Sequence, residues 1–127
     1  MSRKLNVGLI GHKFMGRAHS NALRDISMFF DAGAQPYMKV ICGVEDDIAQ
    51  AAEKYGWESY ETDWRKVVDN HDIDIIDISS TGVTHMEIAV AAAKAGKHII
   101  CEKPLSMTAA EARAMYDAVV ENKVKHM

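Results

Sequence analysis

Short apolar runs alternate with amphipathic segments along the chain, and this alternation most constrains the fold. The apolar runs have the length of buried strands, and the segments between them carry apolar residues three and four positions apart, as helices do. The order predicts parallel strands covered on both faces by helices. We therefore expect an α/β fold, a doubly wound parallel (Rossmann) sheet with strand order 3-2-1-4-5-6. The predicted strands are residues 4–10, 38–44, 57–60, 73–79, 98–102 and 124–127, and the predicted helices are residues 15–31, 46–55, 63–68, 84–95 and 108–122.

Turn residues and capping boxes set the ends of several predicted helices. Residues 33–36, which include a glycine and a proline, are expected to end the first helix. Thr84 with Glu87, and Thr108 with Glu111, have the spacing of capping boxes. In such a box the threonine hydroxyl accepts a hydrogen bond from a first-turn amide while the glutamate reaches back. Two helices are therefore expected to begin at these threonines.

The composition limits the classes of function. The net charge is −3 and no apolar run is long enough to span a membrane, so we expect neither nucleic acid nor a membrane as a partner. Cys42 and Cys101 lie inside apolar runs, which is typical of buried reduced thiols in a cytoplasmic protein. No cysteine and histidine spacing indicates a metal site. Residues 1–127 would form one domain, and because residues 124–127 resemble the start of a strand, we expect a longer protein.

The first turn, in the stretch VGLIGHKFMGRAHS (residues 7–20), has part of a dinucleotide-binding pattern. Gly11 and Gly16 stand where the first and third glycines of G-x-G-x-x-G belong, and Lys13 stands in place of the second. The amides that open the following helix would bind a pyrophosphate. The alternative is a strand-to-helix turn that binds nothing. We expect the Lys13 side chain to turn outward and flank the cofactor.

Three other strand ends carry candidate site residues, because ligands of open α/β sheets lie at the carboxyl ends of the strands. After the second strand, Glu45 and Asp46 are candidates for the adenosine ribose, although Asp46 would equally favour the dipole of the next helix. After the fourth strand, residues 79–85 could let a flat cofactor pass close to the backbone, or form an ordinary polar loop in which His85 packs or caps.

The third of these ends is Glu102-Lys103-Pro104. Pro104 disfavours a helical conformation at Lys103, so the lysine should leave the strand tip along the ligand crevice. There its ammonium could orient a substrate hydroxyl or take part in its proton transfer. The alternative is a surface lysine that precedes a turn.

Two stretches together resemble the N-terminal half of the glucose–fructose oxidoreductase / inositol dehydrogenase / MocA family. They are VGLIGHKFMGRAHS and DIIDISSTGVTHMEIAVAAAKAGKHIICEKPLSMTAAEA, and the resemblance runs from about residue 4 to the end. It implies a domain that binds NAD or NADP, with Lys103 as the active-site lysine. By the same resemblance the cofactor-binding residues would be Gly11, His12, Lys13, Phe14 and Met15 at the pyrophosphate, Gly43 and Val44 at the adenosine ribose, and Ser79, Ser80, Thr81, His85 and Glu102 toward the nicotinamide.

The resemblance also implies what the whole protein does. It would transfer a hydride between the nicotinamide and a hydroxyl-bearing carbon of a sugar, cyclitol or polyol. An absent C-terminal α/β domain would supply an Asp, a His, most of the substrate pocket and the contacts of a homo-oligomer. Gly43 stands where NAD-preferring members carry Asp, and Val44 is not the Arg of an NADP reader, so we expect NAD but leave NADP open. The alternatives are a non-catalytic NAD(P)-sensing module and a fold that binds no nucleotide.

Overall fold

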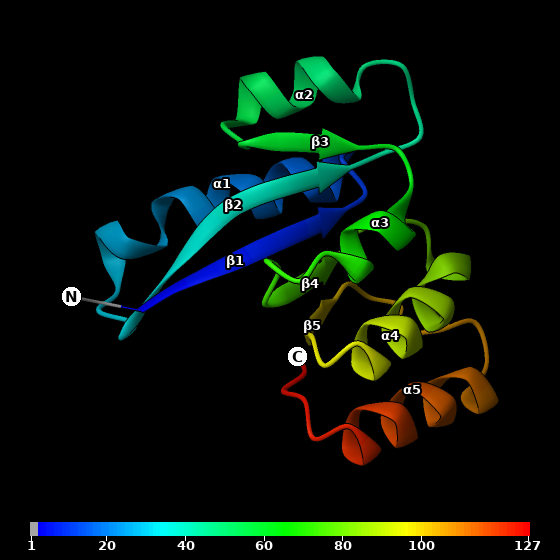
Figure 1. Cartoon of the computed structure of the whole chain (residues 1–127). Helices are drawn as coiled ribbons and strands as arrows, with labels where there is room; N and C mark the ends of the chain where they lie inside the picture. The colour runs from blue at the N-terminus through cyan, green and yellow to red at the C-terminus, as the bar shows by residue number, and fades with distance from the viewer. Residues whose placement is uncertain (1–2) are drawn as a thin grey trace.

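A five-stranded parallel sheet forms the centre of the computed structural model, which describes residues 3–127 (Figure 1). The strand order is β3-β2-β1-β4-β5, so β1 lies at the centre of the sheet. The strands β2 and β3 follow on one side of β1, and β4 and β5 follow on its other side, so the strand order reverses between β1 and β4. This confirms the doubly wound arrangement expected from the sequence. The strands are β1 (Arg3–Ile10), β2 (Ala34–Cys42), β3 (Ser59–Glu61), β4 (Ile75–Ile78) and β5 (His98–Cys101).

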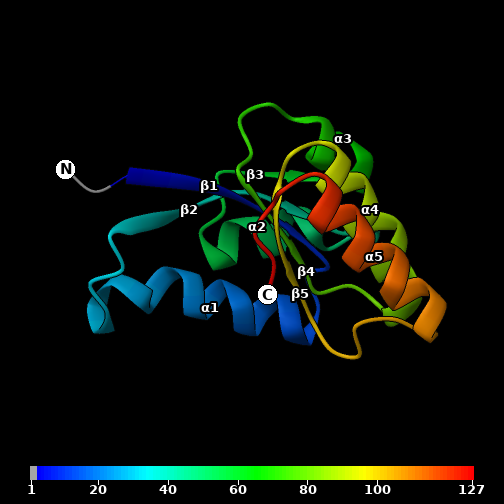
Figure 2. The same cartoon turned by 90° about the horizontal axis from the view of Figure 1, so that it is seen from below.

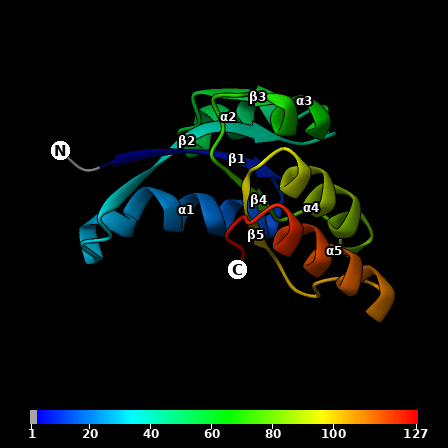
Figure 3. The same cartoon turned by 60° about the horizontal axis from the view of Figure 1, so that its bottom comes forward.

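Helices cover both faces of this sheet (Figures 2 and 3). Two of them, α1 and α2, pack with the apolar cluster that contains Leu9 and Ile41. The helices α3, α4 and α5 pack on the other face, and α4 and α5 lie side by side. Neighbouring residues of one strand alternate between the faces, so Leu9 joins the first cluster and Ile10 the second. The helices are α1 (Phe14–Phe29), α2 (Ile48–Tyr55), α3 (Trp64–Asp69), α4 (His85–Lys94) and α5 (Ala109–Glu121).

The end of α1 and the start of β2 differ from the expected boundaries. The helix ends at Phe29, and residues expected to form a turn already belong to β2, including Pro36. A proline has no amide to donate, which excludes it from a strand that is paired on both sides. The neighbouring strand β3 pairs only with residues 40–42, so β2 has an open edge at Pro36 that accommodates the proline.

The capping box predicted at Thr84 is wrong. A 3-10 turn at Gly82–Thr84 precedes α4, and the Thr84 amide donates to the Thr81 carbonyl at 2.9 Å. The Thr84 hydroxyl donates to the same carbonyl at 2.6 Å, while Glu87 pairs with Arg65 instead of reaching back. The extra turn already places Thr84 in helical conformation, so it is not free to cap the amides that follow.

The second capping box is confirmed in its first half. Thr108 is the N-cap of α5, and its hydroxyl accepts from the Glu111 amide at 3.1 Å. The Glu111 carboxylate accepts from the Met107 amide at 2.9 Å, one residue before the expected partner. Threonine and glutamate therefore still satisfy two amides at this helix start.

The last residues form less of a strand than expected. One parallel bridge joins His126 to Ile99 of β5, on the side where a sixth strand belongs in the predicted order. Cys42 and Cys101 are free thiols; burial raises the pKa of Cys42 to about 12 and that of Cys101 to about 11. No helix within residues 3–127 has the length and apolar character to cross a bilayer.

Candidate functional site

The turn after β1 lies against the backbone that follows β4. Gly11 has a φ of +98°, and a Cβ on it would lie 2.5 Å from the Ser80 amide nitrogen. A Cβ on Gly16 would overlap the Gly11 carbonyl oxygen. Both positions therefore require glycine: the first for its backbone conformation and both for the close approach of turn, helix and neighbouring strand.

The start of α1 has the properties of an anion site. Its N-cap is Lys13, which makes no side-chain capping bond, and the first turn contains no acidic residue. The first amides of a helix have no partner within the helix, and they carry a partial positive charge. Uncovered amides behind a glycine turn at a sheet crevice match what a dinucleotide pyrophosphate requires, so the residues present fit this cofactor.

A cavity of about 240 Å³ lies at the carboxyl ends of β1, β2 and β4, where the strand order reverses. It brings together nine of the residues predicted from the sequence. It does not include Phe14, Met15, Asp46, His85, Glu102 or Lys103. The nine are Gly11, His12, Lys13, Gly43, Val44, Glu45, Ser79, Ser80 and Thr81.

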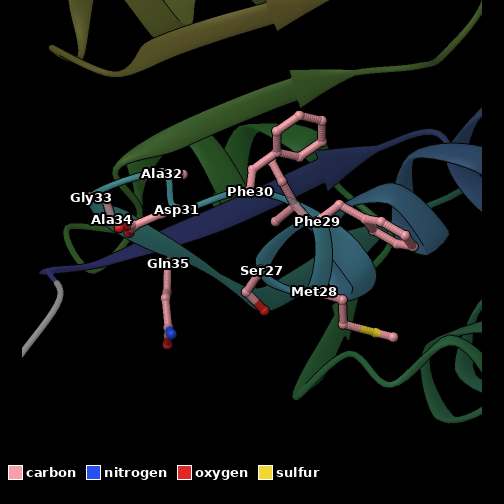
Figure 4. Close-up of a pocket in the computed structure, with 10 residues that line it drawn as sticks. Ser27, Met28, Phe29, Phe30, Asp31, Ala32, Gly33, Ala34 and Gln35 are labelled. Carbon is pink, nitrogen blue, oxygen red and sulfur yellow. The ribbon is translucent and has the colours of Figure 1, made fainter.

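A second hollow, of about 430 Å³, lies at the opposite end of α1 (Figure 4). Its wall is the segment from Ile26 to Gln35, with the exposed aromatic rings of Phe29 and Phe30. This end of the helix faces the amino ends of the strands, away from the glycine turn. Its lining also has no cluster of acid–base groups, so the smaller cavity at the strand ends is the candidate site.

His12, which lines the cavity, is buried next to Gly43. A Cβ on Gly43 would overlap the His12 ring, which explains why the end of β2 carries no aspartate here. The ring Nε2 lies 2.7 Å from Asp47 Oδ1, and Nδ1 lies 3.5 Å from a Glu45 oxygen. Nδ1 is buried without a hydrogen-bond partner within the described residues.

Lys13 and Asp47 form an exposed pair at the mouth of the cavity. The Lys13 ammonium lies 3.2 Å from Asp47 Oδ1, and the lysine side chain is 58% exposed. Hydrogen bonds from His12 and Lys13 lower the pKa of the Asp47 carboxyl. Sequence reasoning named Glu45 and Asp46 but missed Asp47, because α2 begins two residues later than expected, at Ile48.

His85 is a packing residue, which was the second of the two sequence interpretations. It is 1% exposed, with Nδ1 2.9 Å from the Pro104 carbonyl oxygen and Nε2 2.8 Å from that of Ser80. The ring thereby connects the loops after β4 and β5. It supports the backbone around the candidate site and does not line the cavity.

Sequence reasoning also missed a charged cluster that joins α1 to β4 and the end of β5. His19 Nδ1 lies 2.9 Å from both oxygens of Asp77, and Nε2 lies 2.8 Å from Glu102 Oε1. The hydrogen bond to Asp77 is the largest cause that raises the pKa of His19 to about 9. A signal was present in the sequence: Asp77 interrupts the apolar run of a buried strand, which implies a polar partner.

Lys103 follows β5 at the carboxyl edge of the sheet, and its side chain is exposed. Its amide donates to Glu102 Oε2 at 3.0 Å. The structure thus places the lysine at the same edge as the cavity, although it is not among the lining residues. Within residues 3–127 no group of three or more His, Cys, Asp or Glu residues is arranged to hold a metal ion.

A glycine turn, uncovered helix amides and a crevice at the reversal point together describe a dinucleotide-binding domain, and comparison with known proteins decides which kind. The model of the oxidoreductase family with an NAD-binding Rossmann fold matches residues 5–127. The chain belongs to the glucose–fructose oxidoreductase / inositol dehydrogenase / MocA (Gfo/Idh/MocA) family. It forms the NAD-binding domain of that family.

Individual Gfo/Idh/MocA members are similar over nearly all of this chain. A levoglucosan dehydrogenase from Pseudarthrobacter phenanthrenivorans is 50% identical over 127 residues, covering 98% of this chain and 33% of that protein. An inositol 2-dehydrogenase from Salmonella paratyphi B is 29% identical over 120 residues, covering 93% of this chain and 34% of that protein. A solved structure of levoglucosan dehydrogenase in complex with NADH has a TM-score of 0.95 at 50% identity, covering 98% of this chain and 34% of the solved one. The chain therefore spans about a third of the length of these relatives.

The contact between Gly43 and His12 can be tested by a double-mutant cycle. Gly43→Ala should lower the free energy of unfolding by about 1–3 kcal/mol, because the new methyl overlaps the His12 ring. In a His12→Ser background the same change should cost much less, since the ring is gone. Denaturant unfolding of the four proteins measures both values. Equal costs in the two backgrounds would contradict the contact.

The cluster around His19 predicts a stability that depends on pH. Its folded-state pKa of about 9 lies above the usual 6.5, so protonation stabilises the fold. The contribution is fully present below pH 6.5 and is lost as the pH rises through about 9. The free energy of unfolding should fall across this window in the native protein, and the fall should be smaller in His19→Gln. Parallel curves for the two proteins would show that His19 does not cause it.

Proposed function

We propose that the full-length protein is an NAD-dependent dehydrogenase that acts on a hydroxyl-bearing carbon of a sugar, cyclitol or polyol. The observation that carries this is the 50% identity, over 98% of the chain, to a solved levoglucosan dehydrogenase in complex with NADH. The inositol 2-dehydrogenases in the same family favour the same substrate class. NAD supplies the hydride acceptor in such a reaction.

Each element at the strand ends has a role in this proposal. The first amides of α1 hold the pyrophosphate, and Gly11 lets the chain pass close to it. The loop Ser79–Thr81 lies on the side where the nicotinamide would sit. The Lys103 ammonium orients the substrate hydroxyl and stabilises negative charge that develops on its oxygen. The hydroxyl proton then passes to a base from the part of the protein beyond residue 127.

The charges at the end of β2 favour NAD over NADP. Glu45 and Asp47 flank the buried ring of His12, next to Gly43, and a nearby ammonium, that of Lys13, is already paired with Asp47. Between residues 43 and 47 no arginine is available to meet a 2′-phosphate. A doubly negative phosphate at this position would meet two carboxylates, whereas the ribose hydroxyls of NAD can donate hydrogen bonds to them.

Further properties of the whole protein belong to this proposal. The remaining chain would form a C-terminal α/β domain that supplies the substrate pocket, the proton acceptor and the contacts of a homo-oligomer. The free thiols, Cys42 and Cys101, suit a reducing compartment such as the cytoplasm.

Removal of the Lys103 ammonium tests the catalytic proposal. In the full-length protein Lys103→Ala should lower kcat by about 10²–10⁴-fold, the range for loss of a positioned acid–base group. Its KM for NAD should change little, because the lysine is not part of the cavity lining. Lys94→Ala removes an exposed lysine at the far end of α4 and serves as the matched control. Near-normal turnover of Lys103→Ala would refute the role of the lysine.

Titration with both coenzymes tests the choice of cofactor. NADH should bind at least about tenfold more tightly than NADPH, a difference of about 1.4 kcal/mol. Glu45→Gln combined with Asp47→Asn should narrow that ratio, whereas Glu53→Gln, a charge removed from the exposed side of α2, should not. Equal affinities in the native protein would contradict the NAD preference. Tight NADH binding without turnover on any sugar, cyclitol or polyol would favour the sensing module.

A further inference from the structure

We propose that His19 is a positioning residue for Lys103, an inference that rests on the proposed dehydrogenase function. One carboxylate joins the two residues. Glu102 Oε1 lies 2.8 Å from His19 Nε2, and Glu102 Oε2 accepts from the Lys103 amide at 3.0 Å. The imidazole on α1 is therefore two hydrogen bonds away from the backbone that carries the lysine.

The buried side of the cluster fixes the ring. Asp77 lies within β4 and is 1% exposed, so its carboxylate is costly unless a cation and hydrogen-bond donors meet it. His19 Nδ1 lies 2.9 Å from both of its oxygens. A ring that donates to Asp77 through Nδ1 and to Glu102 through Nε2 carries a proton on both nitrogens. The geometry therefore describes an imidazolium between two carboxylates.

The groups that face the ring come from β4 and from the residues that directly follow β4 and β5. Asp77 lies on β4, and the Ser79 hydroxyl, just beyond it, is 3.2 Å from Nδ1. Glu102 directly follows β5, and the residue before it, Cys101, has a thiol pKa that burial raises to about 11. Among the ion pairs of residues 3–127, His19 is the cation that meets both carboxylates of the cluster.

Lys103 depends on this arrangement because little else holds it. Its side chain is exposed, and within the described chain its ammonium has no hydrogen-bond or ion-pair partner, whereas its amide is bound to Glu102. The hydrogen bond from His19 also lowers the pKa of Glu102 and keeps that carboxylate an acceptor. Without the imidazolium, the Glu102 side chain can rotate away from α1. The Lys103 amide then loses the hydrogen bond to Glu102 that fixes the backbone at the lysine.

Two amide variants in the full-length protein separate positioning from general support of the fold. In His19→Gln the side-chain amide can replace the donor at Nε2, toward Glu102, and in His19→Asn it can replace the donor at Nδ1, toward Asp77. We expect His19→Asn to lower kcat by about 10²-fold, the cost of a misplaced catalytic group, and His19→Gln to retain more activity. The KM for NAD should stay within about twofold in both, as for an interaction made outside cofactor binding. His71→Gln, at an exposed turn, is the matched control.

Three measurements accompany the kinetics, and two of them need no turnover. NMR of the resting protein should show a His19 ring that keeps both protons until the pH approaches 9. Hydrogen exchange should show a protected Lys103 amide that loses protection in His19→Asn and keeps it in His19→Gln. In the native enzyme kcat should fall as His19 loses its proton, and this fall should be absent from His19→Gln.

The outcomes separate this inference from the proposed function. Equal losses of kcat in His19→Gln and His19→Asn, with the Lys103 amide unchanged, would overturn the positioning role, and so would a ring that titrates near 6.5. A native protein that turns over no sugar, cyclitol or polyol would refute the proposed function instead. In that case the ring titration and the Lys103 amide still decide whether His19 holds this backbone, and an unprotected amide in the native protein would overturn the inference.

Discussion

The close approach of the first turn to the backbone after β4 is the constraint on which the site depends. Gly11 and Gly16 leave no room for a side chain between β1, α1 and the Ser79–Ser80 backbone. This contact fixes where α1 begins and in which direction it runs across the sheet. The uncovered amides of α1 therefore lie at the crevice, and one turn further along His19 comes within reach of Asp77 and Glu102.

The departure from the usual dinucleotide pattern is a set of coupled substitutions. Lys13 replaces the second glycine and pairs with Asp47, and His12 beside it fills the space that a side chain at position 43 would need. Gly43 and His12 are thus sterically coupled, and the nearby carboxylates, Glu45 and Asp47, contact the histidine ring. A pattern that scores each position separately counts two defects here, whereas the structure shows one alternative arrangement.

The sequence predicted those features that depend on local patterns. Apolar periodicity identified five strands and their parallel order, and the Thr108 capping residue marked the start of α5. Local patterns failed to predict the features that tertiary contacts determine. The 3-10 turn before α4 displaced the capping role of Thr84, and the open edge of β2 allowed Pro36 inside a strand.

The charged cluster shows the same limit within the candidate site. The sequence shows Asp77 as a single acidic residue inside an apolar strand, which indicates a polar partner. That partner, His19, lies 58 residues earlier along the chain, on a helix. No spacing rule connects His19 to Asp77, because the distance between them is set by how α1 crosses the sheet. Sequence reasoning finds such a pair only by asking which cation can reach a buried acid, once the topology is known.

The two sides of the crevice have opposite electrostatic arrangements, which fits a cofactor with two different ends. At the β2 end, the carboxylates of Glu45 and Asp47 are exposed and can accept hydrogen bonds from hydroxyl groups. At the β4–β5 end, the His19 imidazolium that lies between Asp77 and Glu102 offsets part of their negative charge. Lys103 then contributes its positive charge beside a cluster that carries a net charge of about −1. A carboxylate pair without His19 would attract the Lys103 ammonium toward itself, and the imidazolium weakens that attraction, as the proposed role of the lysine requires.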